Sequence, residues 1–154
     1  MVMTGYPLSE EEFKSIYSRV PRLCVDPIVR TDAGIILSLR KNHGWSNQWH
    51  VPGGTLLYKE RVTDGIARIL KSEINADVHV GDFIGYMEFP SEEKERGYGW
   101  SISLVVLCDF IKGDVRPDAN ASEVRIFSAL PDNMIIEQKE FLLKHWDRIS
   151  NGVF

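Results

Sequence analysis

A glycine pair followed by charged residues at fixed distances is the part of this sequence best suited to chemistry. The stretch from Pro52 to Ala76 reads PGGTLLYKERVTDGIARILKSEINA. Gly53 and Gly54 lie between an expected strand and an expected helix, where the lack of a side chain lets a ligand approach the backbone closely. Glu73 follows on the helix, and carboxylate oxygens are ligands that Mg²⁺ accepts. The stretch is therefore a candidate site for a metal ion and a phosphate group.

The helix after the glycines must present the acidic residue to that site. Its apolar residues recur every four positions, which predicts one buried face; they are Val62, Ile66, Leu70 and Ile74. Ile69, Ser72 and Glu73 share another face, because residues three and four apart are neighbours on a helix. A single carboxylate can hold one Mg²⁺ together with a backbone carbonyl, diphosphate oxygens and water, but it cannot anchor several ions.

The rest of the chain predicts a mixed sheet between helices. A capping box from Ser9 to Glu12 opens a helix over about residues 10–20, and LPDN is expected to cap a C-terminal helix over about 134–149. Pro27 indicates an edge strand or a bulge, and the polar residues 91–99 predict a mobile loop. The fold class is α/β (or α+β) with helices on both faces of the sheet. The strands are expected at 23–30, 35–41, 49–52, 77–89, 101–111 and 122–128.

Length, charge and cysteine usage restrict the possible functions. The 154 residues predict a single domain over residues 1–154. A net charge of −4 argues against nucleic acid or an anionic membrane as the partner. No apolar run is long enough to span a membrane, and the N-terminus lacks signal-peptide features, so a cytoplasmic location is expected. Cys24 and Cys108 are expected to be buried free thiols.

The spacing around the glycine pair resembles the Nudix box, G-x5-E-x7-R-E-U-x-E-E-x-G-U, where U is a bulky aliphatic residue. Matching positions within residues 54–76 are Gly54, Glu60, Arg68, Leu70 and Glu73. The preceding WHVPGG also resembles the usual approach to that box. Four positions depart from the pattern, namely Ile69, Ser72, Asn75 and Ala76. The resemblance implies a Nudix hydrolase with a mixed β-sheet sandwiched between α-helices.

The two missing box carboxylates make the chain most similar to one Nudix subfamily, the GDP-mannose mannosyl hydrolases, from about Phe13 to Phe127. That resemblance implies a single Mg²⁺, with Mn²⁺ as a substitute. It also implies attack of water on the sugar C1 of a nucleotide sugar, GDP-mannose or GDP-glucose, which gives GDP and the free sugar. A homodimer whose N-terminal segment crosses between subunits is implied as well.

The same resemblance assigns the metal and substrate contacts. Glu73 matches the Mg²⁺-binding glutamate, and Gly53 matches the residue whose carbonyl is a ligand. Asp26 matches an aspartate on the nucleotide side of the site. Gly54 and Thr55 adjoin the substrate, and Thr55 stands where the family often has an arginine.

Basic residues carry the implied catalytic roles. Arg40 or Lys41 matches the cation that eases departure of GDP, and the register is open by one residue. Arg68 matches the box arginine, which pairs with a box carboxylate or reaches a phosphate. Glu60 matches its structural partner.

The segment RPDANASEVRIF resembles the family stretch that supplies the general base. Asn120 stands where a glutamine is a metal ligand, and Ala121 stands where the family has a histidine. A general base must reach the attacking water by a hydrogen bond, which alanine cannot do. Glu123 and Asp118 are the nearby candidates. If Glu123 acts, attack at phosphorus becomes an alternative to attack at carbon.

Two other functions stay open at this point. One is a Nudix pyrophosphatase that acts on ADP-ribose, another nucleotide sugar or a nucleoside triphosphate. The other is a catalytically decayed nucleotide-binding module, which the missing carboxylates and the missing histidine favour.

Overall fold

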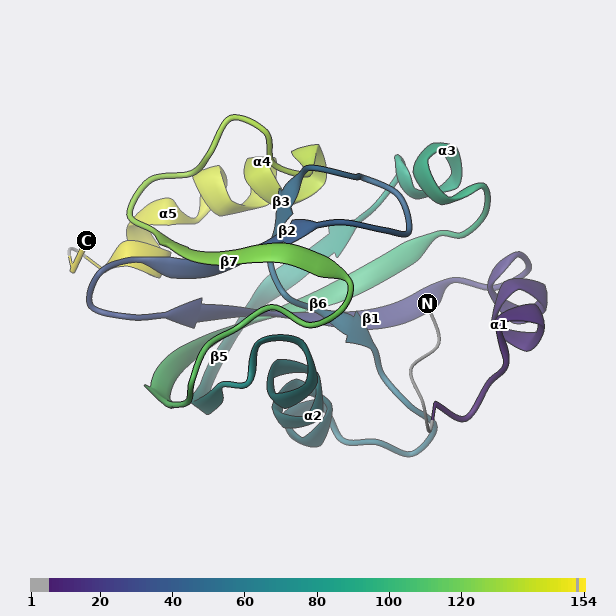
Figure 1. The fold of residues 1–154 in the computed structure, drawn as a ribbon, viewed down its shortest axis with the longest axis horizontal. Coiled ribbons are helices and arrows are strands. Elements are labelled where there is room, and N and C mark those ends of the chain that lie inside the picture. Colours follow the sequence, from purple (N-terminus) through teal and green to yellow (C-terminus); the bar gives the residue numbers. More distant parts are fainter. Residues whose placement is uncertain (1–5, 152) are drawn as a thin grey trace.

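The computed structural model describes residues 6–151 and 153–154, and in it one mixed sheet is flanked by helices on both faces (Figure 1). The strands are β1 (Arg22–Arg30), β2 (Ile35–Arg40), β3 (Trp49–His50), β4 (Gly54–Thr55), β5 (Asp77–Glu88), β6 (Ser101–Lys112) and β7 (Ala121–Phe127). The helices are α1 (Glu10–Tyr17), α2 (Val62–Ile74), α3 (Glu92–Arg96), α4 (Ile136–Lys144) and α5 (Trp146–Ser150). The architecture confirms the predicted fold class.

Strand β1 lies inside the sheet and has different neighbours along its length. The main strand order is β3-β2-β1-β6-β5, with β7 on β2 and β4 on β1. One edge of β1 pairs in parallel with β6, whereas its other edge pairs with β4 at Cys24–Val25 and with β2 only at Arg30. The prediction that Pro27 marks an edge strand or a bulge was wrong as to the edge, because β1 is an interior strand. Pro27 lies in the interval of β1 between the β4 and β2 pairings. Asp26 lies in the same interval.

Helices cover the two faces of the sheet and build a hydrophobic core on each. Helix α2 covers one face, where Ile66, Ile69, Leu70 and Ile74 pack against β1, β2 and β6 residues such as Val25. Helices α4 and α5 lie over the other face, as Figure 1 shows, and Leu142 and Ile149 pack there with Trp49 and Val51. Both cysteines are buried and free, as predicted. Among the described residues, no helix has the length and apolar character needed to cross a membrane.

Three predicted helix or loop boundaries were wrong. The Ser9–Glu12 capping box is present, but its helix ends at Tyr17 rather than near residue 20. The expected C-terminal helix is divided at His145 into α4 and α5, and α4 begins after Ile135 without a side-chain cap. The loop expected at 91–99 contains α3, whose buried residue Glu92 forms ion pairs with Arg22 of β1 and with Arg96 of the same helix.

Candidate active site

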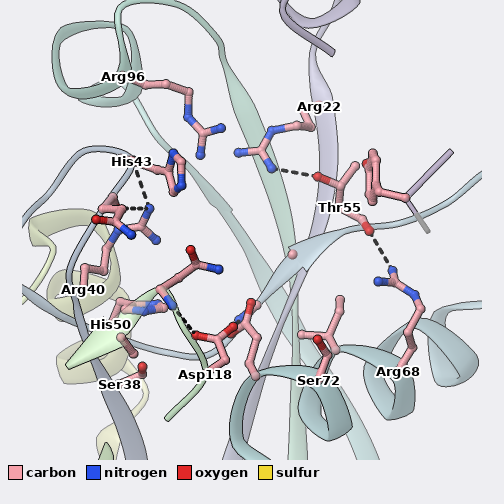
Figure 2. A pocket seen from close by; sticks show the side chains of 18 of the residues that line it. Arg22, Ser38, Arg40, His43, His50, Thr55, Arg68, Ser72, Arg96 and Asp118 are labelled. Atoms are coloured by element: carbon pink, nitrogen blue, oxygen red, sulfur yellow. Dashed lines mark hydrogen bonds between the residues drawn. The ribbon is translucent and has the colours of Figure 1, made fainter. Parts of the chain in front are cut away.

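A cavity opens where the glycine turn, α2, the end of β2 and the segment before β7 meet (Figure 2). These four segments carry the residues that the Nudix resemblance singled out, and the fold brings them to one site. A second, smaller cavity adjoins it and includes Asp26. The residues of the first cavity include Arg22, Arg40, His43, His50, Gly53, Gly54, Thr55, Arg68, Ile69, Ser72, Glu73, Arg96, Asp118, Asn120 and Ala121.

Glu73 lies on α2 against the glycine turn. The backbone N–H of Gly53 donates to its Oε2 atom at 3.3 Å. Burial raises the pKa of Glu73 to about 8, and the nearby negative charge of Asp118 adds to that shift. Both carboxylates line the same cavity, where they would attract a cation.

Asp26 explains why position 53 must be glycine. A Cβ atom added at Gly53 would lie 1.9 Å from Asp26 Oδ1, which is far inside van der Waals contact. Gln138 Nε2 donates to the other oxygen of Asp26 at 3.3 Å. Burial raises the pKa of Asp26 to about 7, although the hydrogen bond from Gln138 opposes the shift. The buried Asp26 carboxylate thus packs directly against the backbone of the glycine turn.

Arg40, and not Lys41, brings its side chain to the cavity. Its guanidinium donates to the carbonyl oxygens of Gly44 and His43, each at 3.0 Å, and lies over the ring of Trp45. Burial, together with repulsion from other arginines, lowers the pKa of Arg40 to about 10. Lys41 is exposed and is absent from the residues lining the cavity. Of the two residues that the sequence left open, Arg40 is therefore the one that lies at the cavity.

Arg68 is held by Glu60, as the resemblance implied for a structural pair. Its Nε and Nη2 atoms donate to the two carboxylate oxygens of Glu60 at 2.7 and 2.9 Å, and Nη2 also donates to the carbonyl of Thr55 at 2.9 Å. The hydroxyl of Thr55 accepts from Arg22 Nη1 at 2.8 Å. This network ties β4, which adjoins the glycine turn, to α2 and to β1.

The two candidate bases, Asp118 before β7 and Glu123 within it, lie in different places relative to the cavity. Asp118 and Asn120 line the cavity, and the N–H of Asn120 donates to Asp118 Oδ1 at 2.9 Å. Glu123 is absent from the lining residues and instead forms an ion pair with its neighbour Arg125 on β7. The fold brings Asp118 to the site and leaves Glu123 outside it.

The oxygen donors of the cavity suit one hard cation. Within the described residues, no group of three or more His, Cys, Asp or Glu side chains is arranged to hold a metal ion. Mg²⁺ commonly binds with one or two carboxylates and completes its shell with substrate phosphates and water. Glu73 is the predicted carboxylate ligand, with Gly53 and Asn120 as predicted carbonyl ligands, and Asp118 lines the same cavity.

Sequence reasoning missed two arginines at the opposite end of the cavity, Arg22 and Arg96 (Figure 2). No local motif marks either one, because they meet through β1 and α3, which are far apart in the sequence.

His50 also lines the cavity, where burial lowers its pKa to about 3 and its Nδ1 lies 2.8 Å from the carbonyl of Val51. His50 is therefore neutral at physiological pH.

Comparison with known proteins decides the family. The NUDIX domain family profile matches residues 20–143. The chain belongs to the Nudix hydrolase family. This Nudix chain is 27% identical over 132 residues to a protein named ADP-ribose pyrophosphatase of Methanocaldococcus jannaschii, covering 86% of the chain and 76% of that protein. It is 32% identical over 81 residues to the low-salt glycan biosynthesis protein Agl8 of Haloferax volcanii, covering 53% of the chain and only 52% of Agl8.

Solved structures share the fold at low sequence identity. A MutT protein from Methanosarcina mazei matches with a TM-score of 0.71 and 20% identity, covering 84% of the chain and 96% of the other. A bifunctional NMN adenylyltransferase/ADP ribose pyrophosphatase from Francisella tularensis, complexed with AMP and a Mn ion, matches with a TM-score of 0.70 and 20% identity. That match covers 91% of the chain and 47% of the Francisella protein. Family members of this fold act with divalent metals on nucleotide-linked substrates.

Proposed function

We propose that this Nudix protein is a Mg²⁺-dependent hydrolase of a nucleoside diphosphate sugar, with Mn²⁺ as a substitute. Water attacks the sugar C1, and the products are the nucleoside diphosphate and the free sugar. GDP-mannose and GDP-glucose are the favoured substrates. The observation that carries the proposal is the distribution of charge in the cavity, which is lined by the carboxylates Glu73 and Asp118 and by four arginines, Arg22, Arg40, Arg68 and Arg96 (Figure 2).

Each chemical role follows from where the side chains lie. Glu73, with the carbonyl of Gly53 and the side chain of Asn120, would hold the cation. When bound, the cation would supply positive charge that stabilises the departing diphosphate. Arg40 adds a fixed positive charge, because its hydrogen bonds to loop carbonyls hold the guanidinium in place. Asp118 accepts the proton of the attacking water, since it is the candidate base that reaches the cavity.

Hydrolysis at phosphorus is the second candidate, and the relative from M. jannaschii favours it. That protein is named for ADP-ribose, which is itself a nucleoside diphosphate joined to a sugar, and it aligns over 86% of this chain. Against it stands the box helix, where Ile69 and Ser72 replace two carboxylates that a cluster of metal ions would need. Glu73 alone remains of the three carboxylates at positions 69, 72 and 73 of the box helix, which favours attack at carbon.

Isotope labelling distinguishes the two reactions. The protein is incubated with Mg²⁺ and a panel of nucleotide sugars in ¹⁸O water, and the products are examined by mass spectrometry. Attack at carbon places the label on the free sugar and releases a nucleoside diphosphate. Attack at phosphorus places it on a nucleoside monophosphate or a sugar phosphate, and this result would replace the first candidate by the second.

A binding module without catalysis is the third outcome of the same assay. It is supported if no nucleotide sugar is turned over while one of them binds tightly. It is excluded by Mg²⁺-dependent turnover that disappears in Glu73→Gln.

Two further predictions from the sequence belong to this proposal. We expect a homodimer in which the N-terminal segment crosses between subunits, and light scattering of the purified chain tests it. We also expect a cytoplasmic location, which fractionation of the source cells tests.

A further inference from the structure

Arg22 and Arg96 form a pair that the proposed catalytic roles leave unused. Arg22 comes from β1 and Arg96 from the end of α3, and their guanidinium groups point toward one another at the end of the cavity away from Asp118 (Figure 2). Both face the same carboxylate. Arg22 Nη2 lies 3.3 Å and Arg96 Nε lies 3.8 Å from Oε2 of Glu92.

Four segments of the chain cooperate to build this arginine pair. Glu92 is 1% exposed, and the hydroxyl of Ser101 on β6 donates to its other oxygen. Gly99 makes room for that carboxylate, since an added Cβ would lie 2.5 Å from Glu92 Oε2. The ring of Phe13 on α1 lies under both guanidinium groups, at 5.5 Å from Arg22 and 6.0 Å from Arg96. The pair is thus a constructed site and not a chance meeting of surface charges.

The charges and hydrogen bonds of the pair are incomplete. Two guanidinium groups share one carboxylate, and their side chains are only 11% and 13% exposed. The Nε atoms of both Arg22 and Arg96 are buried and have no hydrogen-bond partner among the described residues. Buried donors are nearly always satisfied, and a buried charge without a counter-charge is costly. An oxyanion would supply both the acceptor atoms and the missing charge.

We propose that Arg22 and Arg96 form an anion subsite that binds one phosphate of a phosphoanhydride and does so without the metal ion. The inference rests on the proposed function in one respect, namely that the anion is the substrate's diphosphate. The opposite end of the cavity carries Glu73 and Asp118, which repel phosphate unless a cation lies between them. The hydrogen bond from Arg22 to Thr55 also places a positive charge beside the glycine turn. Thr55 stands where the resembled family often has an arginine, so Arg22 brings a guanidinium group to that place from another strand.

Calorimetric titration with inorganic pyrophosphate in EDTA tests the subsite. Wild-type protein should bind pyrophosphate in EDTA, and Glu73→Gln should bind it at least as tightly because a repelling carboxylate is removed. Arg22→Gln and Arg96→Gln should each weaken binding by about 10-fold or more, as expected for loss of a charge-assisted hydrogen bond. Arg148→Gln, which removes an exposed arginine on α5, should leave the dissociation constant unchanged.

Removal of Arg22 leaves the buried negative charge of Glu92 with one basic partner fewer, which could destabilise the fold. The stability of each variant is therefore measured separately. Thermal unfolding is measured for each variant, and Arg22→Gln combined with Glu92→Gln replaces the charged pair by a neutral one. Weak binding in this folded double variant supports the subsite. The subsite is overturned if wild-type protein binds pyrophosphate only with Mg²⁺, or if the arginine variants bind as wild type does. Neither readout involves turnover, so failure of the proposed hydrolysis is a separate result.

Discussion

Asp118 and Glu123 differ at the residue scale in a way that a kinetic comparison can detect. Asp118 lines the cavity, whereas Glu123 pairs with Arg125 on β7. We expect Asp118→Asn to lower kcat for the best nucleotide sugar by about 10²-fold or more, the usual contribution of a general base. Glu123→Gln should keep kcat within about threefold of wild type. The reverse ranking would move the base to Glu123 and reopen attack at phosphorus.

Glu73 is expected to oppose stability in the absence of a cation. Its pKa is raised to about 8 in the fold, so the folded chain binds its proton more tightly than the unfolded chain does. The associated stability is complete below the ordinary carboxyl pKa and is lost as pH rises toward 8. In EDTA at pH 8, Glu73→Gln should therefore raise the melting temperature, by about 2–4 °C for each kcal/mol gained.

The pH dependence is the control for that prediction. At pH 4.5, Glu73 is mostly protonated in the fold, so the difference between Glu73→Gln and wild type should shrink. Mg²⁺ at pH 8 should restore stability to wild type only. A variant that is less stable than wild type at both pH values would show that the carboxylate is held by favourable contacts, and would weaken its assignment as a metal ligand.

At the scale of elements, the end of α2 shows how the box tolerates asparagine in place of glycine. Asn75 is the C-cap, with φ 54° and ψ 45°, which is the left-handed conformation. Glycine adopts it most easily, and asparagine is the next best choice. Its side chain also donates to the carbonyl of Asp114 at 3.1 Å. The helix therefore ends where the box pattern requires.

Asn75→Ala should cost about 1 kcal/mol or more of unfolding free energy, because alanine is strained in the left-handed region. Urea denaturation measures the loss. Asn75→Gly is the matched control and should stay close to wild type. If alanine is tolerated as well as glycine, the backbone at this cap is not the constraint that the geometry indicates.

Packing of the same helix explains why position 69 is not a carboxylate in this chain. Ile69 is 3% exposed and belongs to the core beneath α2, and its Cδ1 atom would be 3.4 Å from a Cβ added at Gly54. A glutamate there would bury a charge against apolar neighbours. Packing therefore accounts for the absence of a carboxylate at position 69, whereas Ser72 is exposed and packing does not explain it.

At the scale of the whole molecule, the sheet needs both of its helical layers. Leu70 on α2 and Leu142 on α4 are 0% and 1% exposed, in separate cores on opposite faces. Leu70→Ala and Leu142→Ala should each cost about 2–5 kcal/mol, the usual range for a buried leucine. Both variants should unfold in urea in one transition, as expected for a single domain. Two separate transitions in either variant would contradict that prediction.

The sequence was sufficient for features that depend on neighbours along the chain. Apolar runs identified the long strands, and box spacing identified α2, the turn at Gly53 and the pairing of Arg68 with Glu60. It was not sufficient where partners are distant. Glu92 lies in a charge run typical of a solvated loop, and its burial depends on partners such as Arg22, 70 positions away, which the local sequence does not reveal. Likewise, spacing alone did not distinguish Asp118 from Glu123, because the bend before β7 decides which one faces inward.

The burial of Glu92 has a consequence for the thermodynamics of ligand capture. Arginine side chains on a free surface lose rotamer entropy when they close on an anion. Here that freedom is already lost during folding, because one enclosed carboxylate and an aromatic ring hold both guanidinium groups. The pair is preorganised, so complex formation should need little adjustment of the protein, and a small rigid anion should benefit from it as fully as a complete nucleotide.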